Sequence, residues 1–430
     1  MYRERAQGLL SFIEKSPSVF HVIGNIKEEL LAKGFTELSE KNVFALEEGG
    51  DYFVTRNDSS IIAFRMPRKK KSVESMGFHI VATHSDSPTF KVKQKPEMVV
   101  DGRYIKLNTE KYGGMILSTW LDRPLSVAGR VAVERNGKIE MRLVNVDKDL
   151  LVIPNVAIHM NRDMNKGVEY NPQIDMIPLF AMKEEEEPMD ALLDLVAASC
   201  EVKTEEILDY DLFLYVRESG RLIGAKEEFI LSPKLDDLQS VYAQMQAFVE
   251  SRPEEYISVA AVFDNEEVGS MTMQGADSTF LSDVLRRVCL AIGADESRYM
   301  EMVAGSMLIS ADNAHAVHPN HPEKADPTNR PYLNGGIVIK YHGGQKYTTD
   351  GISGAACKAL CKKAFVPYQT YQNRSDIAGG STLGNISTAH VSLSSVDVGL
   401  PQLAMHSAVE TAGAQDTEYA VQLFNRFYEQ

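Results

Sequence analysis

The sequence predicts an α/β fold, with a mixed, largely parallel sheet, helices on both faces and a β-rich insertion. From Pro233 onward, apolar strand-like runs alternate with helical periodicity, which is typical of βαβ units and a parallel sheet. Between about residues 92 and 225, short alternating segments dominate instead. We therefore expect a discontinuous α/β domain of residues 1–92 and 228–430, with residues 93–227 forming a separate β-rich domain.

The amino-terminal part predicts two helices followed by three strands. Apolar residues recur at helical spacing within Leu9–Ile13 and again within Val22–Leu31. Gly34 is expected to cap the second helix, because glycine readily adopts the left-handed backbone found there. The strand-like segments are residues 52–55, 60–65 and 78–83.

The insertion carries a clear hairpin signal. Residues 131–135 and 138–144 alternate between apolar and polar side chains. Asn136 and Gly137 lie between them, and this pair favours a two-residue hairpin turn. One helix is expected near residues 189–198.

Composition and charge exclude several classes of protein. The chain has 430 residues, 44% apolar residues and a net charge of −15, so nucleic acid and anionic membranes are not expected as partners. The single basic run, residues 67–71, is expected to be a solvated loop. No apolar run approaches the roughly 20 residues of a spanning helix. The four cysteines show no disulfide spacing, and Cys357 and Cys361 are expected to pack on a helix face, so we expect a cytoplasmic protein.

Common catalytic motifs are absent from the sequence. There is no Walker A loop, no dinucleotide-binding G-x-G-x-x-G after a strand, and no H-E-x-x-H. Residues 379–384 (GGSTLG) lack the G-x-S-x-G spacing of a nucleophile elbow, which argues against a serine hydrolase.

Adjacent glutamates follow a buried strand-like run at residues 256–263. On an extended backbone, Glu266 and Glu267 would point to opposite sides, so one can hold a metal while the other holds a water. The simpler alternative is a solvated loop after a strand.

Further metal-ligand residue types lie just beyond other strand-like segments. In open α/β sheets ligands bind at the carboxyl ends of strands. The candidates are His84 and Asp86 after residues 78–83, Asp312 after residues 307–311, His406 beyond residues 391–399, and Asp236 and Asp237 ahead of a helical run.

Each candidate also has a simpler explanation. One of the two aspartates, Asp236 or Asp237, is expected only to complement a helix N-terminus. His406 could be a hydrogen-bonded core histidine, Asp312 a helix cap and Asp86 part of a turn. Together, however, these explanations require several coincidences at one sheet edge. Two histidines and three carboxylates suit two zinc ions, or cobalt or manganese, with one carboxylate bridging the metals.

Five segments resemble the aspartyl aminopeptidase family of co-catalytic zinc peptidases. They occur in the family's order and span nearly the whole chain: ATHSD (82–86), SPKLDDL (232–238), FDNEEVGS (263–270), ISADNAHAVHPN (309–320) and QLAMHS (402–407). The resemblance implies Glu266 as general base and Asp86 as the residue that orients His84. The implied ligands of two zinc ions per chain are His84 and Asp312 for one ion, Glu267 and His406 for the other, and Asp236 as the bridge.

The resemblance also implies a shared active site and a large assembly. His159, in residues 153–162, matches a family histidine that reaches the active site of a neighbouring subunit as an oxyanion-stabilising donor. Family members form dodecamers built from dimers, with the insertion as the dimer contact, so a homo-oligomer is expected.

Two loops near the implied substrate site depart from the family pattern. The family reads Arg-Asn-Asp before a Gly-Thr-Thr-x-Gly loop, where this chain has RSDIAGGSTLG (374–384). Gly380 and Ser381 are nevertheless the substrate-loop candidates. Residues 173–178 lack the family's His-Leu pair. Lys340 is the positional candidate for a pocket that selects acidic residues, and the alternative is a surface lysine on an edge strand.

The expected function is therefore metal-dependent removal of the amino-terminal residue from peptides, with a preference for acidic residues as one option. A carboxypeptidase or an N-acyl amino-acid deacylase on the same two-metal scaffold is the alternative, because the ligands alone do not separate them. A non-catalytic binding protein that kept the fold is a further alternative, and the complete set of ligands argues against it.

Overall fold

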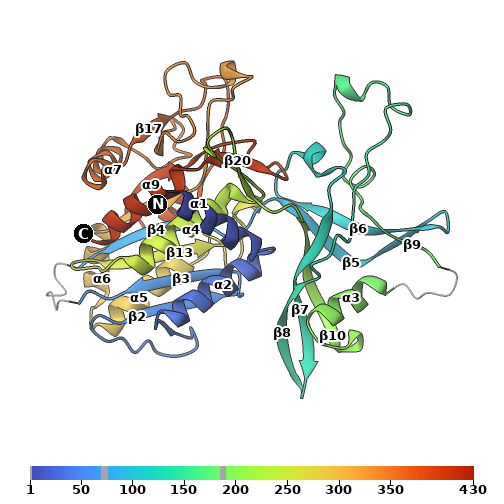
Figure 1. Ribbon diagram of the computed structural model, residues 1–430. Helices are drawn as coiled ribbons and strands as arrows, with labels where there is room; N and C mark the ends of the chain where they lie inside the picture. Colours follow the sequence, from blue (N-terminus) through green and yellow to red (C-terminus); the bar gives the residue numbers. More distant parts are fainter. Residues whose placement is uncertain (1, 69–75, 185–189) are drawn as a thin grey trace.

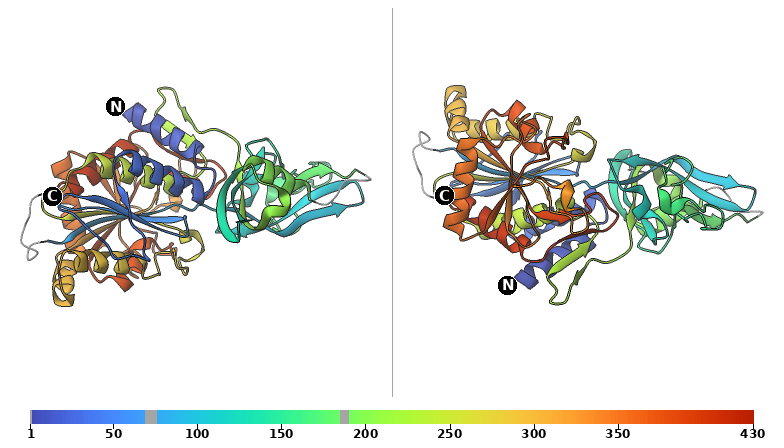
Figure 2. Two further views of the ribbon diagram at one scale, coloured as in Figure 1. Left: turned by 90° about the horizontal axis from the view of Figure 1, so that it is seen from below. Right: turned by 90° about the horizontal axis from the view of Figure 1, so that it is seen from above.

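The computed structural model describes residues 2–68, 76–184 and 190–430. Most of the basic run at 67–71 lies outside these residues. An α/β body carries both chain termini, and the β-rich insertion projects from one side of it (Figures 1 and 2). No helix within the described ranges is long and apolar enough to cross a membrane.

The body is built on a nine-stranded mixed sheet. Strands β13, β4, β14 and β18 run parallel at its centre, and antiparallel pairs join β3 to β13 and β16 to β18. The strands in spatial order are β1 (Thr36–Glu37), β2 (Asp51–Arg56), β3 (Ser60–Arg65), β13 (Ile257–Phe263), β4 (Phe78–His84), β14 (Met307–Ala311), β18 (Ser394–Gly399), β16 (Ile337–Lys340) and β17 (Tyr368–Tyr371).

Helices cover both faces of this sheet (Figure 2). On one face the core contains α1 (Tyr2–Glu14), α2 (Val19–Ala32), α4 (Leu235–Glu250), α7 (Gly351–Ala364) and α9 (Asp416–Tyr428). On the other it contains α5 (Phe280–Ala291), α6 (Glu296–Ala304) and α8 (Leu383–His390). Alternate residues of β4 enter the two cores, Val81 on the first side and Ile80 on the second, so every residue of the strand is buried. The predicted fold class is confirmed.

The amino-terminal helices form where the apolar spacing predicts them. Leu9, Leu10 and Ile13 are buried on α1, and Gly34 follows α2 with a φ of +87°. Cys357 and Cys361 are buried on α7, as expected.

A second, six-stranded antiparallel sheet forms the core of the insertion. Its strands in spatial order are β8 (Lys138–Asn145), β7 (Leu125–Arg135), β10 (Ile207–Val216), β5 (Thr89–Val100), β6 (Tyr104–Tyr112) and β9 (Leu179–Met182). The predicted hairpin is present, because β7 and β8 pair from Arg135 and Lys138 outward. Helix α3 (Ala191–Ser199) packs on this sheet, which has an apolar core of its own.

A third sheet, which the sequence did not predict, connects the elements around the centre of the molecule. Its strands are β11 (Arg221–Ile223), β12 (Phe229–Ser232), β20 (Glu410–Gly413), β19 (Pro401–Leu403) and β15 (Ala314–His315). Short 3-10 helices include η2 (Leu117–Trp120), η3 (Met164–Lys166), η4 (Thr204–Glu206), η5 (Glu266–Val268) and η6 (Pro322–Lys324). Strand β12 leads directly into the start of α4, so this sheet helps to position the first residues of that helix.

Candidate metal centre

The predicted metal ligands gather at the carboxyl edge of the central sheet. His84 is the last residue of β4 and Asp312 directly follows β14. Asp236 lies in the first turn of α4, and Glu267 lies in η5, just beyond β13. His406 comes from the β19–β20 loop, because the short strand β19 lies between it and the strand expected at residues 391–399. The donor atoms form overlapping clusters whose members lie within 4.8 Å of one another.

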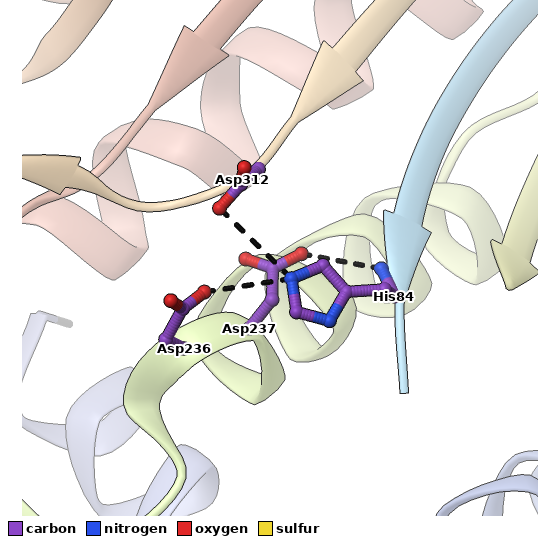
Figure 3. A group of neighbouring side chains, drawn as sticks. All are labelled: His84, Asp236, Asp237 and Asp312. Atoms are coloured by element: carbon purple, nitrogen blue, oxygen red, sulfur yellow. Dashed lines mark hydrogen bonds and ion pairs between the residues drawn. The ribbon is translucent and has the colours of Figure 1, made fainter. Parts of the chain in front are cut away.

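Asp236 lies between the two histidines. Its Oδ1 is 3.5 Å from Nε2 of His84, and its Oδ2 is 3.4 Å from Nε2 of His406. Figure 3 shows His84 directed at Asp236 and Asp312, whose Oδ1 is 3.9 Å from the same ring nitrogen. On the other side, Glu267 Oε1 is 3.3 Å from Nε2 of His406. One carboxylate with a histidine at each oxygen is the arrangement that a bridging ligand requires.

Several buried carboxylate oxygens in this cluster have no hydrogen-bond partner. They are Oδ1 of Asp236, Oδ1 of Asp237 and Oε1 of Glu267. Buried charged oxygens without a partner are costly, and a divalent cation would satisfy them. Histidine nitrogens and carboxylate oxygens are the donors that zinc takes in proteins. The residues therefore fit the metal that the sequence predicts.

The clustered charges shift the pKa values of the ligands. Burial lowers the pKa of His406, but the carboxylates of Asp236 and Glu267 outweigh it and raise that pKa to about 11. Burial raises the pKa of Glu267 to about 7, although His406 opposes the shift. Without a metal, protons on these side chains reduce the repulsion between the carboxylates. A cation that binds here has to displace those protons.

Asp86 lies against both the histidine and the paired glutamates. Nδ1 of His84 is 3.1 Å from the backbone oxygen of Asp86 and 3.4 Å from its carboxylate. The same carboxylate accepts hydrogen bonds from the backbone N–H groups of Glu266 and Glu267, both at 3.1 Å. The Tyr112 hydroxyl, from β6 of the insertion, also donates to it at 2.7 Å. Asp86 therefore joins His84 to the two glutamates that follow β13.

The backbone at the paired glutamates differs from the expected extended one. Asn265 adopts a left-handed conformation with a φ of +60°, and Glu266–Val268 forms the 3-10 turn η5. Both glutamates belong to the same cluster with His84, so they do not point to opposite sides of a strand. The turn brings two acidic side chains to one site because successive residues of a tight helix are only partly rotated from each other.

Asp237 also belongs to the cluster, which corrects the expectation that one of the two aspartates only complements a helix N-terminus. It is fully buried, and its Oδ2 accepts a hydrogen bond from the backbone N–H of His84 at 3.3 Å (Figure 3). Burial raises the pKa of its carboxyl well above the usual range. Neither Asp236 nor Asp237 has helical backbone angles, although both fall within α4.

Lys340 is buried beside Asp312, so the alternative of a surface lysine on an edge strand is wrong. The residue is 2% exposed, and β17 rather than β16 is the edge strand. Its Nζ donates to the backbone oxygens of Asp312 at 2.7 Å and Asn313 at 3.2 Å, and lies 3.6 Å from Oδ2 of Asp312. The neighbouring carboxylates keep this lysine charged, because they raise its pKa despite burial.

The remaining predicted site residues share no hydrogen bond or ion pair with the cluster within the described residues. His159 is exposed in the loop between Ile153 and Leu179 of the insertion, and within the described chain no hydrogen bond or ion pair joins it to the ligands. Gly380 and Ser381 are both exposed in the loop before α8, where the Ser381 hydroxyl donates to Asn385 at 3.0 Å. Contacts in the structure therefore link the metal ligands, Glu266, Asp86 and Lys340.

The family model described as "Aminopeptidase I zinc metalloprotease (M18)" matches residues 12–428. The chain belongs to the M18 aminopeptidase family. A curated relative, "Probable M18 family aminopeptidase 2" of Clostridium acetobutylicum, is 48% identical over 428 residues, which cover 99% of this chain and 98% of the relative. Membership of this family confirms the prediction that the protein is an enzyme, a zinc metalloprotease with aminopeptidase activity. The alternative of a non-catalytic binding protein is therefore wrong.

Solved structures agree with this assignment. One chain in "Cryo-EM structure of the Ape4 and Nbr1 complex" superposes with a TM-score of 0.96 at 39% identity, covering 99% of this chain and 86% of that one. A chain in "Structure of S. cerevesiae mApe1 dodecamer" superposes with a TM-score of 0.86 at 26% identity, covering 99% and 97%. The M18 fold therefore extends through both the body and the insertion.

Proposed function

We propose that this M18 enzyme hydrolyses the amino-terminal peptide bond with two zinc ions and with Glu266 as the general base. The observation that carries the proposal is the position of Asp236 between two histidines, with Glu266 and Glu267 beside His84. His84 and Asp312 would hold one ion, His406 and Glu267 the other, and Asp236 both. Cobalt and manganese suit the same donors. When bound, zinc lowers the pKa of a coordinated water and polarises a carbonyl.

Glu266 is the carboxylate suited to move the proton. It belongs to a cluster with His84 and Glu267, yet it is not needed as a ligand of either proposed ion. Burial raises the pKa of its carboxyl, and nearby Asp312 and Glu267 raise it further, so it holds a proton more readily than a free glutamate. It would accept the proton of the attacking water and deliver it to the leaving amine. Asp86 holds its backbone in place through the hydrogen bond to Glu266 N–H.

Lys340 supports a preference for acidic amino-terminal residues. It places a permanent positive charge directly beside Asp312. An acidic side chain of the substrate would gain from that charge, whereas an aliphatic one would not. Gly380 and Ser381 would line the loop on which the substrate rests. Lys340 already donates to two backbone oxygens, so the strength of the preference depends on its third N–H.

The exposed loop of the insertion supports assembly into a dodecamer built from dimers. Four large apolar side chains are exposed on it, with Met160 at 82%: Val156, Ile158, Met160 and Ile174. Apolar side chains grouped on one exposed segment are typical of an interaction surface. His159 lies among them. In a dimer it would reach the active site of the neighbouring subunit and stabilise the oxyanion.

A panel of aminoacyl substrates tests the proposed function. Acidic and aliphatic substrates are compared, each with zinc, cobalt and manganese supplied to metal-free enzyme. We expect hydrolysis only with metal and only with a free amino group, and higher kcat/KM for acidic residues. Blocked peptides should be inert. Good turnover of amino-blocked substrates would instead favour a deacylase, and equal rates for acidic and aliphatic residues would remove the role of Lys340.

A further inference from the structure

A buried carboxylate with no role in the mechanism above lies directly behind the metal ligands. Glu410 is the first residue of β20 and is 2% exposed. Its Oε2 accepts a hydrogen bond from the backbone N–H of Asp236 at 3.0 Å, and its Oε1 accepts one from the backbone N–H of His406 at 2.7 Å. One side chain therefore joins the backbones of two ligands that are far apart in the sequence.

Neither of these ligands is held by regular secondary structure. His406 lies in the β19–β20 loop beyond the last strand pair, Leu403 and Thr411, and has a φ of +65°. This left-handed region is uncommon for a residue with a Cβ. Asp236 has a φ of −82° and a ψ of 109°, so it does not follow the helix in which it lies. Contacts from elsewhere in the fold have to fix both positions.

The chemistry of the contact requires a carboxylate. Both oxygens of Glu410 face N–H donors, and a carboxylate has two acceptor oxygens and no donor. A glutamine has one oxygen and one NH₂ group, so one backbone N–H would face another donor. That N–H would lose its partner while it stays buried, which is costly.

The same arrangement occurs on the other side of the cluster. The carboxylate of Asp86 accepts the backbone N–H groups of Glu266 and Glu267, and that of Asp237 accepts the N–H of His84. Asp312 needs no such partner, because its N–H donates to the Val398 oxygen of the neighbouring strand. Glu410 completes this set for the two ligands that the other carboxylates do not reach.

We propose that Glu410 is a positioning residue that sets the separation of Asp236 and His406 and thereby the affinity for the ion these two would share. The proposal rests on the ligand assignment of the proposed function. A carboxylate that orients ligands through hydrogen bonds typically contributes about 10–100-fold to metal affinity. The effect should be larger on this ion, because Glu410 contacts both Asp236 and His406, whereas the other ion would share only Asp236 with this pair.

Asp416 provides a matched control. It is fully buried, and its two oxygens accept the backbone N–H groups of Asn334 at 2.7 Å and Gly336 at 2.9 Å. This loop carries none of the metal ligands. Asp416→Asn therefore removes the same kind of contact, with a similar loss of buried hydrogen bonding, at a place where metal binding should not respond.

The experiment is a zinc titration of metal-free wild type, Glu410→Gln and Asp416→Asn against a chelating indicator, with thermal unfolding of the metal-free proteins measured in parallel. We expect two ions per chain in wild type and Asp416→Asn. In Glu410→Gln the ion held by His406 should bind about 10–100-fold more weakly, and the ion held by His84 should be weakened less. Glu410→Asp keeps the charge on an arm one methylene shorter and should weaken the binding of the ion held by His406 less. If Glu410→Gln does not fold, Glu410→Asp is compared with wild type and Asp416→Asn instead.

The proposal would be overturned if the Glu410 variants bound each ion as tightly as wild type does. It would also be overturned if Asp416→Asn lost the same amount of zinc affinity. Failure of the proposed peptidase reaction would be seen separately, as zinc-loaded wild type that does not cleave aminoacyl substrates. The titration decides the role of Glu410 in either case. A wild type that binds no zinc would overturn both.

Discussion

The metal cluster lies among buried residues that hydrogen bonds hold in place, whereas the loop that carries His159 is exposed along most of residues 154–175. In the cluster, Asp86, Asp237 and Glu410 each hold the backbone of at least one neighbour. The loop has few such contacts and exposes apolar side chains. One chain therefore brings the candidate metal ligands together by itself, whereas the role that we propose for the loop requires a second chain.

The largest expected effect separates the two glutamates inside the cluster. Glu266→Gln should keep both metals and lower kcat by about 10²–10⁴, which is typical for loss of a general base. Glu267→Gln should instead lose metal, because it removes the charged oxygen beside His406. Metal content and kcat of both purified variants provide the measurement. Near-parental turnover by Glu266→Gln would contradict the assigned roles.

The next effect tests whether the loop acts on another subunit. His159→Ala should lower kcat by about 10²–10³, the typical cost of one oxyanion donor, with metal content unchanged. Asp163→Ala, on the same exposed loop, is the matched control and should keep full activity. Mixed oligomers of His159→Ala and Glu266→Gln should regain part of the activity, because one subunit type would combine an intact cluster with an intact neighbouring loop. No recovery in verified mixed oligomers would show that the site is not shared.

His79, near the start of β4 and at the other end of the strand from His84, should contribute to stability and not to catalysis. His79 is stacked between the rings of Tyr256 and Phe427, and burial lowers its pKa to about 4, although a hydrogen bond to the Phe427 oxygen opposes the shift. The unfolded ring has a pKa of about 6.5, so the unfolded chain binds more protons between pH 6.5 and 4. The contribution of His79 to the free energy of unfolding should therefore be fully present above pH 6.5. It should decrease by about 3 kcal/mol as the pH drops to 4.

Urea unfolding of wild type and His79→Gln at several pH values measures this contribution. The difference in slope between the two proteins isolates His79 from the other groups that titrate. Activity at pH 7 should be the same in both. An identical pH dependence in the two proteins would mean that the ring is not held neutral.

The smallest expected effect comes from the place where the insertion touches the cluster within one chain. The Tyr112 hydroxyl donates to Asp86 and accepts from Nδ2 of Asn265 at 2.8 Å. Tyr112→Phe removes both hydrogen bonds, each of which contributes about 1 kcal/mol. We expect the activation free energy to rise by about 1–1.5 kcal/mol, which lowers kcat about tenfold, with metal content retained. Steady-state kinetics checks this. An unchanged kcat would mean that Asp86 needs no support from the insertion.

The sequence predicted the parts of the site that depend on residue type and strand order. Strands ending at His84 and Asp312 could be recognised because parallel strands place their carboxyl ends at one edge. Glu410 was missed, although a glutamate four residues beyond His406 is visible in the sequence. Nothing local shows that its two oxygens reach backbone groups of separate elements. The turn at Glu266 was also missed, because the left-handed Asn265 that starts it is not apparent from the surrounding residues.

Sequence alone determined the fold class and the family and predicted the candidate ligands, because apolar periodicity and short motifs are local properties of the chain. Only the tertiary structure decided that Asp236 lies between His84 and His406, that Asp237 belongs to the cluster and that Lys340 is buried beside Asp312. Those facts depend on how the central sheet, α4 and the β19–β20 loop pack against one another. Burial and the distances between charges arise from that packing, and they determine which carboxylates hold protons, which hold backbone groups and which remain to hold a metal.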